Sequence, residues 1–209
     1  MRLRLCKLWI IALLLGAGGV AAQDTLSRYA SEAPREVGTV RDGRKVGTWR
    51  YYYPDGTLSA EEPYHAGQLH GTARYYDFEG RLQAEERWRD GLQEDTSTYY
   101  HPNGQVDKVG RFEAGLYAGK WRFYHADGSP RRVGHYEQGL PEGEWRFHDE
   151  AGNLWQTGRF RAGKEEGTWR FYRPDGSLEF EGDFVGGEKR GAWKTYNRRG
   201  RVRRTEHYP

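Results

Sequence analysis

The chain has 209 residues, with 33 Lys and Arg against 30 Asp and Glu, and so a formal net charge of +3. Its mean hydropathy is −1.01, although 15% of its residues are aromatic. A disordered chain would lack so many large rings. The composition therefore predicts a folded, thin β-protein that buries rings beneath polar surfaces.

The segment 1–22 has the order of a secretory signal peptide. Three basic residues precede an apolar run, Leu8–Val20, and Val20 and Ala22 occupy the positions that a signal peptidase recognises. The run is shorter than the roughly 20 residues of a membrane-spanning helix, so an uncleaved anchor is the less favoured alternative. We expect export to the periplasm, the cell envelope or the extracellular space.

Removal of this segment changes the cysteine content and the charge. Cys6 precedes the apolar run and leaves with it, so the mature chain has no cysteine for a disulfide. The three basic residues leave too, and the mature chain balances 30 basic against 30 acidic residues. A neutral chain lacks the net basic face that nucleic acid requires, so we expect no nucleic-acid partner.

After a lead segment, 23–36, which we expect to cover the first edge of the fold, the segment 37–209 is a tandem repeat of constant period without insertion or deletion. The seven units start at Gly43, Gly67, Gly91, Gly115, Gly139, Gly163 and Gly187. A second column holds Gly47, Gly71, Asp95, Gly119, Gly143, Gly167 and Gly191. A third column holds Gly56, Gly80, Gly104, Gly128, Gly152, Gly176 and Gly200.

Each unit predicts two short strands and two turns. In the sixth unit, the alternating aromatic stretch 167–172 predicts a strand, and the Pro-Asp-Gly that ends at Gly176 predicts a hairpin turn. The fold class is therefore all-β: an elongated, twisted antiparallel β-hairpin array of about 14 strands, plus an N-terminal half-unit at 37–42. An open sheet beyond about 10 strands must curl. The last strand ends at Tyr208, and its exposed edge is a candidate for homo-oligomer formation.

The repeat resembles the bacterial variant of the MORN repeat, a resemblance best seen at Tyr136–Phe147 and Phe160–Phe171. Proteins of this type are often classed with the YwqK-type antitoxins, and the resemblance implies a binding scaffold. Choline-binding repeats share the Trp, Tyr and Gly content, but they are shorter and lack the Gly-x-x-x-Gly turn. Units two and three depart from the pattern, because Ala73 and Ser97 replace Trp and Asp95 replaces Gly, so we expect these units to be flexible or specialised.

Strand alternation divides the first strand of each unit between two faces. One face, here the Trp face, is the predicted structural core, because rings of this size dominate burial. It holds Trp49, Trp121, Trp145, Trp169, Trp193, Tyr51, Tyr75, Tyr99, Phe123, Phe147 and Phe171.

The opposite face carries cations and phenols in turn and is our candidate binding face, here the Arg/Tyr ladder. It holds Arg50, Tyr52, Arg74, Tyr76, Tyr100, Arg122, Tyr124, Arg146, Arg170, Tyr172, Lys194 and Tyr196. We expect these side chains to stack as cation–π pairs, or to form a self-satisfied, solvated surface. An anionic or sugar-like polymer, or an acidic protein surface, would fit them.

Metal and catalytic sites find little support in the sequence. His101 and His125 lie in one column of adjacent units, roughly 9–10 Å apart, too far to share an ion, and we expect them to be turn residues. The pairs Glu61-Glu62, Glu85-Glu86 and Glu165-Glu166 should point to opposite faces as solvated charges. No catalytic triad, phosphate loop or HExxH motif is present, so we expect neither an enzyme nor a cofactor.

These observations favour an exported, non-catalytic scaffold that binds a protein, in the style of an antitoxin or immunity protein. A cell-wall or glycan-binding module that uses the Arg/Tyr ladder is the alternative. A membrane-surface adaptor is a weaker one, because the mature chain has no net charge and no amphipathic helix.

Overall fold

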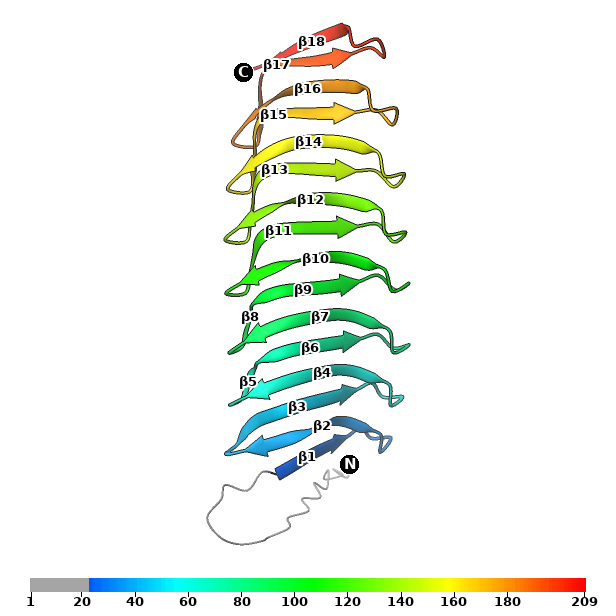
Figure 1. The fold of residues 1–209 in the computed structure, drawn as a ribbon, viewed down its shortest axis with the longest axis vertical. Coiled ribbons are helices and arrows are strands. Elements are labelled where there is room, and N and C mark those ends of the chain that lie inside the picture. The colour runs from blue at the N-terminus through cyan, green and yellow to red at the C-terminus, as the bar shows by residue number, and fades with distance from the viewer. Residues whose placement is uncertain (1–22) are drawn as a thin grey trace, which may run out of the picture.

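A computed structural model describes residues 23–209, and the predicted signal peptide lies outside these residues. One sheet of 18 antiparallel strands makes up the fold (Figure 1). The strands are β1 (Gln23–Arg28), β2 (Pro34–Arg41), β3 (Arg44–Tyr52), β4 (Leu58–His65), β5 (Gln68–Leu69), β6 (Gly71–Tyr76), β7 (Leu82–Arg89), β8 (Leu92–Gln93), β9 (Asp95–Tyr100), β10 (Val106–Glu113), β11 (Leu116–Tyr124), β12 (Pro130–Glu137), β13 (Leu140–His148), β14 (Leu154–Arg161), β15 (Lys164–Tyr172), β16 (Leu178–Val185), β17 (Glu188–Tyr196) and β18 (Val202–Tyr208).

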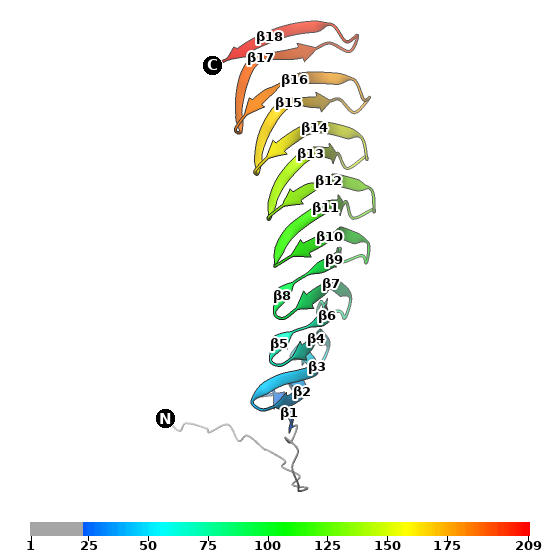
Figure 2. The same cartoon turned by 60° about the vertical axis from the view of Figure 1, so that its left-hand side comes forward.

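Successive strands pair with their sequence neighbours, so the sheet is a meander of hairpins stacked along one axis. Figure 2 shows that the strands curve in a common sense while the sheet remains open. The predicted fold class, an all-β hairpin array that twists along its length, is confirmed. Within residues 23–209, no helix has the length and hydropathy needed to cross a bilayer.

The segment before the repeats takes part in the sheet. β1 pairs with β2 from Gln23 opposite Val40 to Arg28 opposite Pro34, and β2 starts before the expected boundary at Val37. The side chain of Tyr29 donates a hydrogen bond to the carbonyl of Tyr52, 2.7 Å away. Tyr53 donates in the same way to the carbonyl of Tyr76, which shows that the lead segment follows the contact pattern of the repeats.

Two kinds of turn explain the glycine columns. At Asp42-Gly43 both residues have positive φ, 51° and 69°, as a two-residue type I′ hairpin requires. At the other end of each hairpin, the amide of Gly56 donates to the carbonyl of Tyr53, and Gly56 has a φ of 92°. In the second column, Asp95 has a φ of 66° in place of Gly, and Asp is one of the few residues that tolerate this conformation.

The buried interior lies on one side of the sheet and is built from Trp–Gly pairs. Each Trp of the Trp face lies over a Gly of the preceding strand. The pairs are Trp49 with Gly38, Trp121 with Gly110, Trp145 with Gly134, Trp169 with Gly158, and Trp193 with Gly182. The five indoles are 0–5% exposed, and Phe123 is buried among them while Phe147 and Phe171 are half-buried.

Four of these indoles also donate a hydrogen bond to a backbone carbonyl, as Trp121 does to Arg111 at 3.0 Å. The glycine thus provides both the space for the ring and access to the carbonyl of the residue that follows it. Edge-to-face contacts continue the packing from unit to unit, for example between Phe160 and Trp169, whose ring centroids lie 5.0 Å apart.

Candidate functional site

The Arg/Tyr ladder lies on the face opposite the indoles. Its cations are exposed, apart from the half-buried Arg74, and its six tyrosines are half-buried. Of the two alternatives for the ladder, cation–π stacking between its members is not found within residues 23–209. The cation–π contacts of residues 23–209 involve rings of the Trp face, as with Lys45 over Trp49 at 4.0 Å and Arg132 over Phe123 at 4.1 Å. These cations cover the rings of the core.

Charge pairing divides the ladder into two kinds of unit. Arg50 donates to Glu61 at 2.9 Å, directly across from it on the next strand. Arg74 and Glu85 form the same pair at 3.0 Å, and Arg170 and Glu181 at 3.1 Å. The expectation that Glu61 and Glu85 are solvated charges is therefore wrong, because each neutralises a ladder arginine.

Units four and five lack this neutralisation. Arg122 lies between Val109 and Val133 on the flanking strands, and Arg146 lies between Val133 and Thr157. Within residues 23–209, neither guanidinium has a carboxylate oxygen within 4 Å. Two exposed cations separated by an apolar side chain therefore form the least neutralised part of the ladder, which we call the central patch: Val109, Arg122, Val133, Arg146 and Thr157.

A hollow of about 240 Å³ adjoins the central patch. It lies over Thr157 and Gly158, and the side chains of Arg146, Arg159 and Arg170 line it together with Glu144. A guanidinium is a planar donor that binds a carboxylate through two parallel hydrogen bonds. The hollow therefore has the chemistry to accept carboxylate side chains from outside the chain.

The Trp face of units two and three forms a second candidate surface. Ala73 and Ser97 stand where the other units have Trp, and Glu62 and Glu86 stand in the column that holds the paired Gly in the other units. Ala73 and Ser97 are fully buried, so these units are packed and specialised. The first strand of each of these units is divided in two, as β5 with β6 and β8 with β9.

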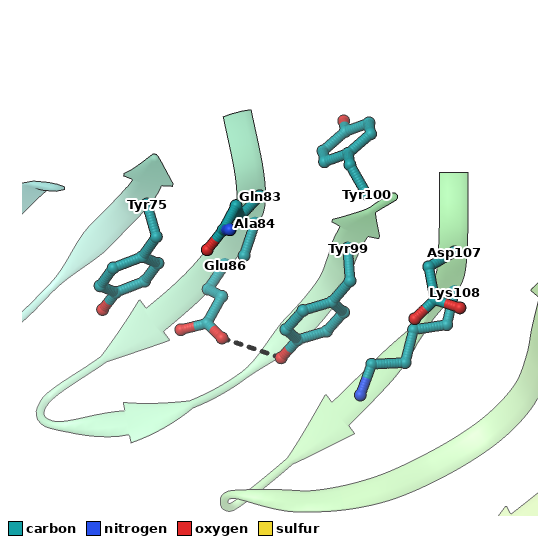
Figure 3. Close-up of a pocket in the computed structure, with 8 residues that line it drawn as sticks. All are labelled: Tyr75, Gln83, Ala84, Glu86, Tyr99, Tyr100, Asp107 and Lys108. Carbon is teal, nitrogen blue, oxygen red and sulfur yellow. Dashed lines mark hydrogen bonds between the residues drawn. The ribbon is translucent and has the colours of Figure 1, made fainter. Parts of the chain in front are cut away.

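The exchange of an indole for a carboxylate opens a groove of about 450 Å³ (Figure 3). Glu86 lies between Tyr75 and Tyr99 in it, and Lys108 lies at its far side. The carboxylate of Glu86 accepts hydrogen bonds from Tyr99 at 2.8 Å and from the indole of Trp88 at 3.1 Å. The expectation that Glu86 is a solvated charge is wrong, because its oxygens are engaged by ring donors.

The phenols of this groove remain protonated at neutral pH. Burial, and then the charges of Glu62 and Glu86, raise the pKa of Tyr75 above its usual range. Burial also raises the pKa of Tyr99, with a further contribution from its hydrogen bond to Glu86. The groove is therefore a network of hydrogen-bond donors around a carboxylate. A sequence signal for it existed, since Glu62 and Glu86 interrupt a column of glycines.

His101 and His125 hold neighbouring units together. The Nε2 atom of His101 lies 3.1 Å from the carbonyl oxygen of Tyr124, and that of His125 lies 3.4 Å from the carbonyl oxygen of His148. Because a carbonyl only accepts, Nε2 carries the proton in both rings. Both residues occupy the turn column of Tyr29 and Tyr53 and make the same contact to the next unit.

Comparison with protein families identifies the repeat. The model described as "MORN repeat variant" matches residues 45–66, 118–138, 141–162 and 165–185. Over these four stretches the chain is similar to the MORN repeat variant. The matched stretches lie in units one, four, five and six, which have the Trp–Gly pair, and the unmatched units are two and three, where Ala73 and Ser97 replace Trp, and the last unit, which holds Trp193.

The remaining comparisons add no function. Curated proteins give no match. Among solved structures, the chain is similar to one described as "Crystal Structure of TcdB2-TccC3-Cdc42", at 11% identity and a TM-score of 0.20, over 84% of this chain and 13% of that one. The chain thus spans a small part of that chain's length, and at this TM-score the likeness carries no argument about the repeats described here.

Proposed function

We propose that this MORN-variant array is a non-catalytic scaffold that binds an acidic protein partner through the central patch of its Arg/Tyr ladder. One observation carries the proposal. Cross-strand glutamates neutralise the arginines of units one, two and six, whereas Arg122 and Arg146 are flanked by Val109, Val133 and Thr157.

The balance of polar and apolar groups in the central patch supports a protein partner. Exposed arginine next to apolar side chains is typical of the centre of a protein–protein interface. The hollow lined by Arg146, Arg159 and Arg170 would accept the partner's carboxylates. On this face the exposed Glu113 and Glu137 lie at the strand ends, whereas the exposed Glu144 lies beside Arg146 and lines the hollow.

Export and an antitoxin-like or immunity role extend this proposal. The predicted signal peptide would place the scaffold outside the cytoplasm, and the partner would then be an exported or envelope protein. If the scaffold neutralises a toxin, that toxin would act in the same compartment.

The test is an affinity capture with a matched control. Purified protein is immobilised and exposed to envelope and secreted fractions of its own cell, beside a column with Arg122→Ala and Arg146→Ala and a control column with Arg50→Ala and Arg74→Ala. Each variant removes two ladder arginines, but only the first removes unpaired ones. We expect one stoichiometric acidic protein on the wild type and the control, and its loss from the first variant.

Other outcomes would redirect the proposal. Equal loss on both variant columns would indicate non-specific charge attraction. If no column retains a protein at micromolar concentration, the proposal that the central patch binds a protein partner is wrong. If the wild type instead retains purified peptidoglycan, and Tyr124→Ala with Tyr172→Ala abolishes this, the glycan-binding alternative would replace the protein-binding one.

A further inference from the structure

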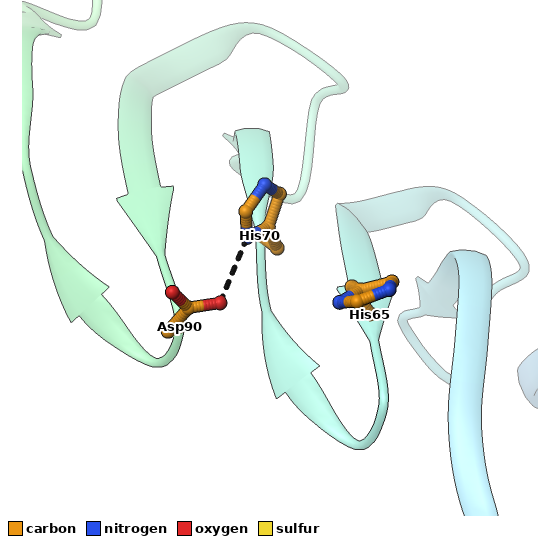
Figure 4. Close-up of side chains that lie close together, drawn as sticks. All are labelled: His65, His70 and Asp90. Carbon is orange, nitrogen blue, oxygen red and sulfur yellow. Dashed lines mark hydrogen bonds and ion pairs between the residues drawn. The ribbon is translucent and has the colours of Figure 1, made fainter.

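Three metal-ligand side chains meet at the turn edge of unit two, away from both surfaces described above. They are His65 at the end of β4, His70 between β5 and β6, and Asp90 directly after β7 (Figure 4). One potential ligand atom of each lies within 4.8 Å of the others, and all three side chains are exposed. The Nδ1 atom of His70 lies 3.1 Å from a carboxylate oxygen of Asp90.

His70 stands at a position that holds a glutamate in several other units. In three other units the same column holds Glu, and its carboxylate accepts a hydrogen bond from the backbone amide of the turn that follows: Glu94 from Ala114, Glu142 from Ala162, and Glu166 from Gly186. The corresponding amide in unit two belongs to Asp90. His70 instead faces the side chain of Asp90. Unit two therefore has an imidazole–carboxylate contact where these three units have a hydrogen bond from the turn amide to a glutamate.

The neighbouring positions complete the set. Asp90 follows β7 with a φ of 50°, in the type I′ turn column in which units three and five have Ala114 and Ala162. His65 precedes the equivalent turn of the unit before, and its ring centroid lies 5.6 Å from that of His70 at an interplanar angle of 59°. The two rings are therefore tilted around a common space and are not stacked.

The donor set and spacing suit a divalent transition ion. Two imidazole nitrogens and one carboxylate oxygen are common ligands of Zn²⁺, with bonds of about 2.0–2.2 Å. Ligand atoms of a tetrahedral ion lie about 3.4 Å apart, which follows from those bond lengths. His70 and Asp90 already have about this separation. His65 is exposed, and one of its ring nitrogens lies within 4.8 Å of the ligand atoms of His70 and Asp90.

We propose that His65, His70 and Asp90 form a Zn²⁺ site with an open coordination position for water or for a side chain of a partner. The site would tie the ends of β4 and β7 together across the β5–β6 interruption. This is a region where the array lacks a Trp–Gly pair, so an ion that binds the folded state would stabilise it.

The experiment titrates metal-free protein, without an affinity tag that binds metal, with Zn²⁺ by calorimetry and with Co²⁺ by visible absorption. Three variants are compared: His65→Ala, His70→Gln, and the control His135→Ala, which removes an exposed histidine of β12. His70→Gln should keep the fold, because the amide oxygen can accept from the Asp90 backbone amide as Glu does in other units. Circular dichroism checks that each variant is folded.

We expect one ion per chain for the wild type and the control, and at least about tenfold weaker binding for each site variant. Zn²⁺ should also raise the melting temperature of the wild type and the control alone. Non-saturable binding, or a site that survives both His65→Ala and His70→Gln, would overturn the proposal. If His70→Gln alone weakened binding, His65 would not be a ligand and the three-residue site would be wrong.

Discussion

The indole of Trp169 lies directly against the backbone of Gly158, so that a Cβ added there would lie 2.0 Å from the ring. The same relationship recurs at a constant sequence separation in five pairs of the sheet, and it sets the depth at which each ring is buried. Because no second layer from residues 23–209 covers this face, the fold depends on rings that lie flat over glycine.

We expect Gly158→Ala to lower the free energy of unfolding by about 1–3 kcal/mol, because the methyl group must displace the ring. Urea unfolding measures this. Trp169→Ala should cost more, about 3–5 kcal/mol. The double variant should cost less than the sum of the two, since removal of the ring relieves the clash. Strict additivity would show that the two residues are not coupled.

Unit two lacks the Trp–Gly pair, so the pair can be introduced there by substitution. Ala73 is fully buried and Glu62 stands in the glycine position, so Ala73→Trp alone should destabilise the array through overcrowding. Combined with Glu62→Gly, the same substitution would restore the Trp–Gly pair. We expect the double variant to be at least as stable as the wild type in urea, and a double variant no more stable than Ala73→Trp alone would contradict this.

The ladder ion pairs should contribute little to stability. Arg50 and Glu61 are partly exposed, and exposed cross-strand pairs contribute about 0.2–1 kcal/mol. Arg50→Ala should therefore change the free energy of unfolding by less than about 1 kcal/mol, with a smaller effect in high salt. A double-mutant cycle with Glu61→Ala measures the coupling energy of the two residues. A salt-independent coupling energy well above this range would contradict the prediction that the ion pair contributes little to stability.

Alkaline pH should weaken the fold at units two and three. Burial raises the pKa of the Tyr75 and Tyr99 phenols in the folded state, whereas an unfolded tyrosine ionises at a pH of about 10. Stability from these groups is complete below that pH and is lost as the pH rises above it. Urea midpoints should therefore fall above pH ~10. The urea midpoint should fall less for the variant with Tyr75→Phe and Tyr99→Phe. An equal fall of the midpoint in this variant would show that groups other than these two phenols cause it.

The predicted signal peptide has a direct test. Intact mass measurement of the protein recovered from the envelope or the medium should give a chain that begins at Gln23. Recovery of the chain with Met1 to Ala22 attached, in the membrane fraction, would favour the uncleaved anchor.

Most of the fold could be predicted because the glycine columns specify turns, and turns specify the register of a hairpin. The alternation of Trp and Arg then separated two faces, since successive side chains of a strand point to opposite sides. The pairing of each Trp with a glycine of the preceding strand was not predicted, because it joins adjacent strands and depends on how a ring lies in space.

The sites were harder to predict for the same reason. The paired or unpaired state of a ladder arginine depends on its cross-strand neighbour: Glu61 for Arg50, but Val133 for Arg122. His65 and His70 flank one turn, but Asp90 belongs to the next hairpin end, and it meets them only because successive hairpins stack side by side. A comparison of columns could have found them, since His70 stands in a column that holds glutamate in three other units.

The constant period of the repeat has a consequence for how such a chain can change. Because each unit adds two strands of about 4.8 Å spacing, an in-frame duplication or loss of one unit would lengthen or shorten the array by about 10 Å and leave every turn intact. The gain or loss of a unit between the central patch and the histidine cluster of unit two would therefore change the distance between these two sites in steps of one unit. The packing of the units in between would stay the same.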